Sequence, residues 1–212
     1  MACPFSKNNA LSLVFFAFIA LALGIGFNLW HTNEHKINPP DSETQISQPH
    51  GLPEFSLIDG SGHPFTNHNL KGHYSFLFFG YTHCQGICPM TMALLTQLYA
   101  QLEKQKLPLP QIVFITLDPK RDKQKVVDNY VHAFNPAFKG VTGPLVGIQQ
   151  LSKQMGVITI RAKEEEQDNK NYQIDHSGTL YLIDPAGELI AVFSPPHEKD
   201  TIAKDYKALI RI

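Results

Sequence analysis

The chain has 212 residues, of which 43% are hydrophobic and 17% are charged, and its formal net charge at pH 7 is −1. This size and composition fit one domain with a proper core plus accessory segments. A net charge this close to zero gives no reason to expect a nucleic-acid partner or an anionic binding surface, since both call for a strongly basic face.

The N-terminal region predicts a membrane anchor. Residues 11–30 carry no charged side chain, and a helix of that length matches a hydrocarbon core of about 30 Å. A cleaved signal peptide has a shorter apolar core and a small-residue cleavage site, whereas this run continues through Phe27 to Trp30. We therefore expect one N-terminal transmembrane helix, an uncleaved signal anchor, after a cytosolic segment of residues 1–10. A cleaved signal is the alternative.

The same region predicts the cellular location of the domain. A mitochondrial targeting segment should be amphipathic and Arg-rich, and the first ten residues contain no Arg. We expect the bacterial inner membrane instead, with a single pass and the globular domain in the periplasm. Cys3 would then stay in the cytosol, and only Cys84 and Cys88 would lie where disulfides can form.

Residues 31–51 are polar and contain three prolines, which predicts a flexible linker. As a coil, this linker would span roughly 25 Å. It would hold a domain of residues 52–212 close to the membrane, together with the partners of that domain.

Apolar runs and turn signals predict alternating strands and helices in this domain. We expect strands at residues 55–58, 64–65, 74–80, 112–117, 179–183 and 189–193, the last two as a hairpin. Helices are expected from Pro89 onward and at residues 122–134, 144–155 and 198–210, with an exposed loop at 161–171. A helix between two buried strands makes those strands parallel, so the order predicts an α/β sandwich with a mixed central sheet.

Two cysteines stand between the buried run 74–80 and the helix that opens at Pro89. This spacing places Cys84 in the strand-to-helix loop and Cys88 at about the N-cap. Unpaired backbone N–H groups and the positive end of the helix dipole favour thiolates there. A structural disulfide or a pair of inert thiols is the alternative.

Such a thiolate pair points to copper. Two soft sulfur donors select Cu(I), with zinc as a competitor. Structural zinc sites usually need four protein ligands, so a three-coordinate Cu(I) site is easier to build. His176 precedes the strand 179–183 and would approach the cysteines if that strand lay antiparallel beside 74–80. His83, next to Cys84, is the competing third ligand, and spacing alone leaves both open.

Four motifs in order resemble the Sco/SenC family: GYTHCQGICP at 80–89, DPKRD at 118–122, YQIDHS at 172–177 and YLIDPAG at 181–187. The resemblance covers most of residues 52–212. It implies a thioredoxin-like, peroxiredoxin-related fold that binds copper, Cu(I) or Cu(II), and serves assembly of the dinuclear CuA centre of cytochrome c oxidase.

The resemblance also implies roles for single residues. Cys84 and Cys88 match the paired copper thiolates and His176 the third ligand, while His83 matches a position that is not normally a ligand. Asp118 matches an acidic residue that supports the site or docks the partner, although it could simply cap the turn before the helix at 122. Gln85 stands where many relatives have proline, which is expected to loosen the loop and shift the dithiol potential.

These observations predict a membrane-anchored copper metallochaperone rather than primarily an enzyme. Its expected partners are the copper-receiving oxidase subunit and an upstream copper donor or thiol reductant. The alternative is a thiol–disulfide oxidoreductase that keeps the cysteines of that subunit reduced, with attack by Cys84 and resolution by Cys88. Peroxidase activity fits poorly, because the Pro-x-x-x-Thr-x-x-Cys pattern is absent around Cys84.

Overall fold

A computed structural model describes residues 19–24, 44–45, 48–157, 159–161 and 172–210. The chain divides into two compact units, Met1–Pro39 and Pro40–Ile212. In the first unit, residues 19–24 are helical. No helix among the described residues is long and apolar enough for a membrane span, and the remainder of the predicted span 11–30 lies outside those residues.

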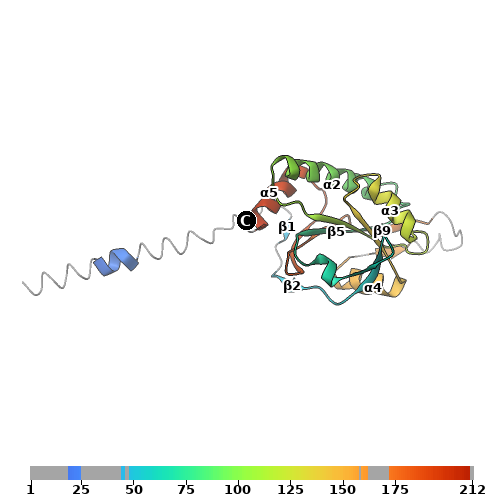
Figure 1. The fold of residues 1–212 in the computed structure, drawn as a ribbon, viewed down its shortest axis with the longest axis horizontal. Helices are drawn as coiled ribbons and strands as arrows, with labels where there is room; N and C mark the ends of the chain where they lie inside the picture. The colour runs from blue at the N-terminus through green and yellow to red at the C-terminus, as the bar shows by residue number, and fades with distance from the viewer. Residues whose placement is uncertain (1–18, 25–43, 46–47, 158, 162–171, 211–212) are drawn as a thin grey trace, which may run out of the picture. The chain divides into compact units, whose positions relative to one another are not determined.

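The second unit is built on a large mixed sheet (Figure 1). Its elements, in chain order, are β1 (Thr44–Gln45), β2 (His50–Gly51), β3 (Ser56–Asp59), β4 (Pro64–Thr66), the 3-10 helix η1 (Asn67–Leu70), β5 (Ser75–Gly80), α2 (Ile87–Lys104), β6 (Gln111–Thr116), α3 (Gln124–His132), β7 (Lys139–Thr142), α4 (Leu145–Gln154), β8 (Thr159–Arg161), β9 (Ile174–His176), β10 (Leu180–Ile183), β11 (Glu188–Phe193) and α5 (Lys199–Leu209).

The sheet has nine strands in the order β1-β11-β10-β5-β6-β7-β3-β4, with β2 also paired to β11. β5 lies at its centre, parallel to β6 and antiparallel to β10. The parallel pairing confirms the expectation from the sequence, and the antiparallel pairing meets the condition under which residues 179–183 would approach the cysteine loop. Strand β7, which was not predicted, extends the sheet parallel to β6. β1 and β2 fall in the segment expected to be linker.

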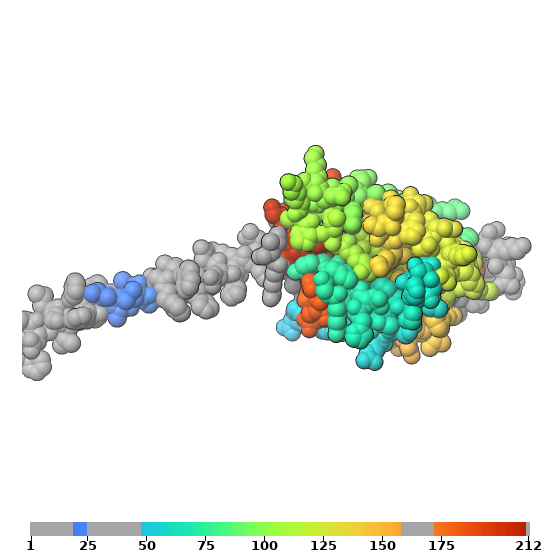
Figure 2. All heavy atoms as spheres, viewed as in Figure 1, coloured from blue at the N-terminus to red at the C-terminus, as the bar shows by residue number. Residues whose placement is uncertain are grey.

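The central strands are buried because apolar side chains point to both faces of the sheet. Every residue of β5 is buried. One face packs against α2, α3 and α5, and the opposite face packs against α4. Figure 1 shows α2 and α5 together on one side of the sheet and α4 on the other, and Figure 2 shows the surface of α2 in green along the top of the domain. The expected α/β sandwich with a mixed sheet is confirmed.

Candidate metal centre

The two cysteines occupy the loop and the first helical turn that follow β5. Cys84 is half-buried, Cys88 is fully buried, and both thiols are free. The N-cap of α2 is Gly86, so the prediction that Cys88 forms the N-cap is wrong. The helix can start before Pro89 because backbone N–H groups in a first turn have no intrahelical partner, so a proline there loses no hydrogen bond, and Ile87 packs against the core. Cys88 therefore points into the domain from the first turn.

Gly80 leaves the space that the buried thiol occupies. A Cβ atom at this position would lie 2.6 Å from Cys88 Sγ and 2.8 Å from Cε2 of Phe114. Real Cβ contacts are not that short, so a side chain here would displace the sulfur or the aromatic ring. Because Gly80 has no side chain, the sulfur of Cys88 packs directly against the backbone at the end of β5.

His176 completes the group from β9. Its Nε2 lies 3.0 Å from Cys88 Sγ, and its Nδ1 lies 2.9 Å from the carbonyl oxygen of Ile174. A carbonyl can only accept, so Nδ1 carries a proton and Nε2 is the nitrogen that faces the sulfur. A backbone carbonyl in this role is the usual means of orienting a metal-binding imidazole.

The ligand atoms of Cys84, Cys88 and His176 all lie within 4.8 Å of one another, and they form the metal-compatible cluster that the described part of the chain contains. His83 is not in this cluster. Its half-exposed ring lies 3.1 Å from Thr82 Oγ1 and 3.6 Å from a carboxylate oxygen of Asp122. Of the two candidate histidines, the structure brings His176 to the thiols.

The two thiols differ in acidity. A hydrogen bond from the Cys88 thiol lowers the pKa of Cys84 to about 5, against the opposing effect of burial and with help from the backbone N–H groups of Gly86 and Cys88. The same hydrogen bond and burial raise the pKa of Cys88 far above its ordinary range. The Cys88 proton could serve either Cys84 or His176 Nε2, and the charged sulfur is the stronger acceptor. The metal-free site is thus a Cys84 thiolate beside a Cys88 thiol.

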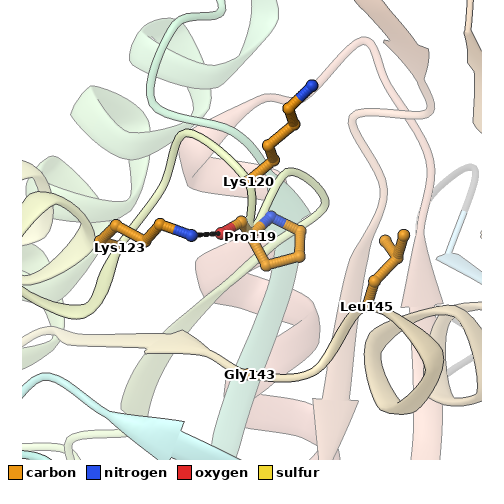
Figure 3. Close-up of a pocket in the computed structure, with 5 residues that line it drawn as sticks. All are labelled: Pro119, Lys120, Lys123, Gly143 and Leu145. Carbon is orange, nitrogen blue, oxygen red and sulfur yellow. Dashed lines mark hydrogen bonds between the residues drawn. The ribbon is translucent and has the colours of Figure 1, made fainter.

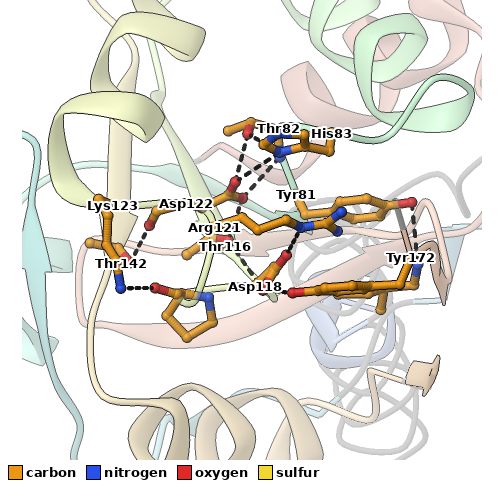
Figure 4. A network of polar contacts seen from close by, with 12 residues as sticks. Tyr81, Thr82, His83, Thr116, Asp118, Arg121, Asp122, Lys123, Thr142 and Tyr172 are labelled. Atoms are coloured by element: carbon orange, nitrogen blue, oxygen red, sulfur yellow. Dashed lines mark hydrogen bonds and ion pairs between the residues drawn. The ribbon is translucent and has the colours of Figure 1, made fainter. Parts of the chain in front are cut away.

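Asp118 lies next to this site but outside the cluster. It is fully buried and accepts hydrogen bonds from the hydroxyl of Tyr172, at 2.6 Å, and from Nε of Arg121 (Figure 4). Burial opposes ionisation, yet these two donors hold the pKa of its carboxyl below the usual range. Asp118 is not the N-cap of α3, which is Lys123, but its carboxyl also accepts a hydrogen bond from the backbone N–H of Arg121, in the turn before that helix.

Several residues of this region were not identified from the sequence. Asp122 is buried and accepts hydrogen bonds from Thr82 and Thr116. Tyr81 and Arg121 lie between Asp118 and His176. Their partners are far apart in sequence, up to 93 residues, so local patterns carry no signal for them. The motifs that contain them were noted only for their resemblance.

A separate open pocket of about 400 Å³ is lined by Pro119, Lys120, Lys123, Gly143 and Leu145 (Figure 3). Within it, Lys123 Nζ donates to the carbonyl oxygen of Pro119 at 3.0 Å. None of its lining residues belongs to the metal-compatible cluster, so it is not part of the candidate metal centre.

The SCO1/SenC family model matches residues 43–211. Among curated proteins, an SCO2-like protein of Rickettsia felis is 38% identical over 140 residues, which is 66% of this chain and 67% of that protein. The mitochondrial protein SCO2 of Saccharomyces cerevisiae is 38% identical over 136 residues, 64% of this chain. The match spans less than half of that yeast protein, 45%.

Solved structures agree with the sequence relatives. Yeast Sco1 with copper bound has a TM-score of 0.70 at 28% identity, covering 76% of this chain and 88% of that one. Arabidopsis thaliana ScoI with copper bound has a TM-score of 0.67 at 28% identity, covering 74% and 99%. The family motifs, the matched fold and these relatives lead to one conclusion: the chain belongs to the SCO1/SenC family.

Proposed function

We propose that this protein is a copper metallochaperone that holds copper between Cys84, Cys88 and His176. The observation that carries this proposal is the convergence of two sulfur atoms and one imidazole nitrogen within 4.8 Å. Relatives whose structures contain copper support it, as does family membership. The fold that we infer for this domain is the thioredoxin-like one of the family.

The donor set explains why copper is preferred. Two soft thiolates stabilise Cu(I), and neutral imidazole suits both Cu(I) and Cu(II). Zinc in a structural site usually takes four protein ligands, and this cluster offers three. Because the ligands must be deprotonated, binding of copper should release the proton that Cys88 retains in the metal-free site.

Burial of the ligands suggests an order for copper release. Cys84 and His176 are half-buried, whereas Cys88 is fully buried. Donor atoms of an acceptor can therefore reach the metal from the side of Cys84 and His176. Cys88 would be the last ligand to dissociate from the copper. A three-coordinate ion leaves room for such an incoming ligand before an old one departs.

We propose that the acceptor is the copper-receiving subunit of cytochrome c oxidase, at the stage when its CuA centre is assembled. Residues 11–30 would anchor the protein in the bacterial inner membrane, and residues 52–212 would face the periplasm. An upstream copper donor or thiol reductant would load or reduce the site. The resemblance of the motifs and the uncharged run 11–30 support this part of the proposal.

A second candidate function is thiol–disulfide exchange, favoured by the difference in acidity between the two cysteines. The Cys84 thiolate would attack a disulfide of the acceptor and form a mixed disulfide, releasing one acceptor thiolate. Cys88 would lose its proton and attack the sulfur of Cys84, releasing the second thiolate. Two electrons then pass from this dithiol to the acceptor, and the Cys84–Cys88 disulfide remains.

A paired assay separates the two functions. The purified chain, loaded with one equivalent of Cu(I), is mixed with a reduced acceptor peptide, while the metal-free chain is mixed with the same peptide in its disulfide form. A metallochaperone transfers copper, and His176→Ala abolishes delivery while leaving thiol exchange within about tenfold. In copper-limited cells, wild-type oxidase assembly by His176→Ala together with failure of Cys84→Ala would leave only the reductase.

A further inference from the structure

The strand that carries His176 belongs to a different sheet from the strand that precedes the cysteines. β9 pairs with β8 in a two-stranded sheet, whereas β5 lies in the nine-stranded sheet. Among the described residues, the pairing of β10 with β5 brings the chain after His176 near the cysteine loop, but β9 itself does not pair with the nine-stranded sheet. Side-chain contacts supply the direct links between β9 and the nine-stranded sheet.

One such contact begins two residues before β9. The hydroxyl of Tyr172 donates to Asp118 Oδ1 at 2.6 Å, and the guanidinium of Arg121 lies 3.6 Å from the centroid of the Tyr172 ring. Arg121 Nε also donates to Asp118. We call Asp118, Arg121 and Tyr172 the clamp. Since Asp118 and Arg121 follow β6, the clamp ties the start of β9 to the nine-stranded sheet.

Tyr81 makes a second link, from the loop that also carries Cys84. Its hydroxyl donates to the side-chain oxygen of Gln173 at 2.6 Å and accepts from the backbone N–H of Ile174 at 3.3 Å. Its ring meets the ring of His176 edge-on, with centroids 5.5 Å apart. Figure 4 shows the guanidinium of Arg121 between the rings of Tyr81 and Tyr172.

The chemistry of arginine suits this position. Its guanidinium is planar and weakly hydrated, so it can stack on aromatic rings and bond a carboxylate at the same time. The side chain of Arg121 is only 11% exposed and that of Asp118 is not exposed at all. Their opposite charges cancel, so the clamp orders β9 without adding net charge beside the thiolate of Cys84.

We propose that the clamp positions His176 for copper, so that Arg121 and Tyr172 set how well the imidazole reaches the metal without touching it. This inference rests on the proposed copper function. The three residues act through the backbone that leads from Tyr172 to His176. Tyr81 bonds this backbone and also packs against the ring of His176. The thiols, which are fixed by β5 and α2, do not depend on the clamp.

The test uses two clamp variants and one matched control in the purified full-length chain. Tyr172→Phe removes the hydroxyl that bonds Asp118, and Arg121→Lys keeps the charge but loses the planar stack. Tyr206→Phe is the control, because it removes a comparable hydrogen bond, to the carbonyl oxygen of Pro108 at 2.8 Å, far from the site. Both clamp variants should weaken Cu(II) binding roughly 10- to 100-fold. Cu(I) binding should stay within about threefold, because it depends mainly on the thiolates.

A second readout needs no metal. Nitrogen chemical shifts of the His176 ring in the reduced, metal-free chain should report a proton fixed on Nδ1 in the wild type and in Tyr206→Phe. In the two clamp variants, they should move towards a mixture of tautomers. Such a change would support the role of the clamp whether or not the chain binds copper. Absence of copper binding by the wild-type chain would refute only the proposed copper function.

A different result would refute the positioning role of the clamp and leave the proposed copper function intact. It would consist of wild-type copper binding, a loss of Cu(II) affinity in His176→Ala, and clamp variants that match Tyr206→Phe in both readouts. Unfolding of the whole domain in Tyr172→Phe would also overturn it, because the proposal predicts a folded chain with intact Cu(I) binding.

Discussion

The sulfur side and the imidazole side of the candidate metal centre are held in different ways. Cys84 and Cys88 follow the central strand of a nine-stranded sheet, and the space for the Cys88 sulfur is set by backbone at Gly80. His176 lies on a strand of a two-stranded sheet and is held by side chains from distant parts of the sequence. The fold itself therefore fixes the sulfur pair, while a few contacts fix the imidazole.

This difference suggests a division of labour. The rigid sulfur pair should provide most of the affinity for Cu(I), because soft thiolates are its preferred ligands. The imidazole, which can be moved by changes in a small number of contacts, should decide how well Cu(II) is held and when copper is released. A change on one side of the site should therefore leave the other side in place.

Loss of one sulfur donor should have the largest effect. If a four-ligand metal site is worth about 10–16 kcal/mol, one ligand contributes roughly 2.5–4 kcal/mol, which is at least about 60-fold in affinity. Cys88→Ser should therefore weaken Cu(I) binding by at least that factor, measured by competition with a chromogenic Cu(I) chelator.

Mild oxidation of the wild type to an intramolecular disulfide should abolish Cu(I) binding, since both donors are consumed. Full copper retention by the oxidised chain would place the ligands elsewhere.

Loss of the imidazole should discriminate between the two oxidation states. His176→Ala should weaken Cu(II) binding by about 100-fold or more, and Cu(I) binding by less than about tenfold. His83→Ala is the matched control, because His83 lies beside Asp122 and outside the cluster. Equal losses for both ions in His176→Ala, or a larger effect of His83→Ala, would contradict the division of labour.

Crowding at Gly80 should disturb the sulfur side through packing. The Cβ of Gly80→Ala would lie 2.6 Å from Cys88 Sγ, and such overpacking typically costs about 1–3 kcal/mol. For a chain of this size, each kcal/mol lowers Tm by about 2–4 °C. Gly51→Ala is the control, since nothing lies within 4 Å of the added atom. Thermal unfolding of the two metal-free variants tests this, and equal Tm values would show that the end of β5 tolerates a side chain.

The acidity of Cys84 gives a prediction for pH. In the reduced, metal-free chain, its rate of alkylation should be flat above about pH 6 and fall below a pKa of about 5. Because folding lowers this pKa from 9.0 to about 5, the folded chain binds fewer protons than the unfolded chain between those values. Its contribution to stability therefore grows as pH rises from 5 to 9, and is lost as pH falls through 5.

The Cys88 thiol is the main cause of this acidity. Cys88→Ala should accordingly move the midpoint of the alkylation profile of Cys84 towards higher pH. A midpoint that stays where it is would assign the acidity to the backbone N–H groups of the loop instead.

The sulfur side could largely be predicted from the sequence, because it depends on neighbours along the chain. The apolar run at 74–80, the loop and the leucine stripe after Pro89 indicate a buried strand, a turn and a helix. The start of that helix was placed two residues late, at Pro89 instead of Ile87. Gly86 caps it without a side-chain hydrogen bond, so no capping residue marks the boundary.

The imidazole side could be predicted only in part. Its approach to the cysteines depends on the antiparallel pairing of β10 with β5, which the sequence offered only as a condition and which the structure shows. The contacts that orient it were not, because Tyr172 and Asp118 are 54 residues apart and Tyr81 and Gln173 are 92 apart. Stacking of Arg121 on two tyrosines depends on tertiary structure and has no local pattern. The choice of His176 over His83 came from the family motifs and not from spacing.

X-ray absorption at the copper edge of the Cu(I)-loaded chain tests the central claim most directly. The account predicts a three-coordinate ion with two sulfur donors and one nitrogen donor in the wild type. It predicts loss of the nitrogen in His176→Ala and loss of one sulfur in Cys88→Ser. A wild-type spectrum with nitrogen or oxygen donors alone, or one that is unchanged in both variants, would contradict the assignment of Cys84, Cys88 and His176 as the copper ligands.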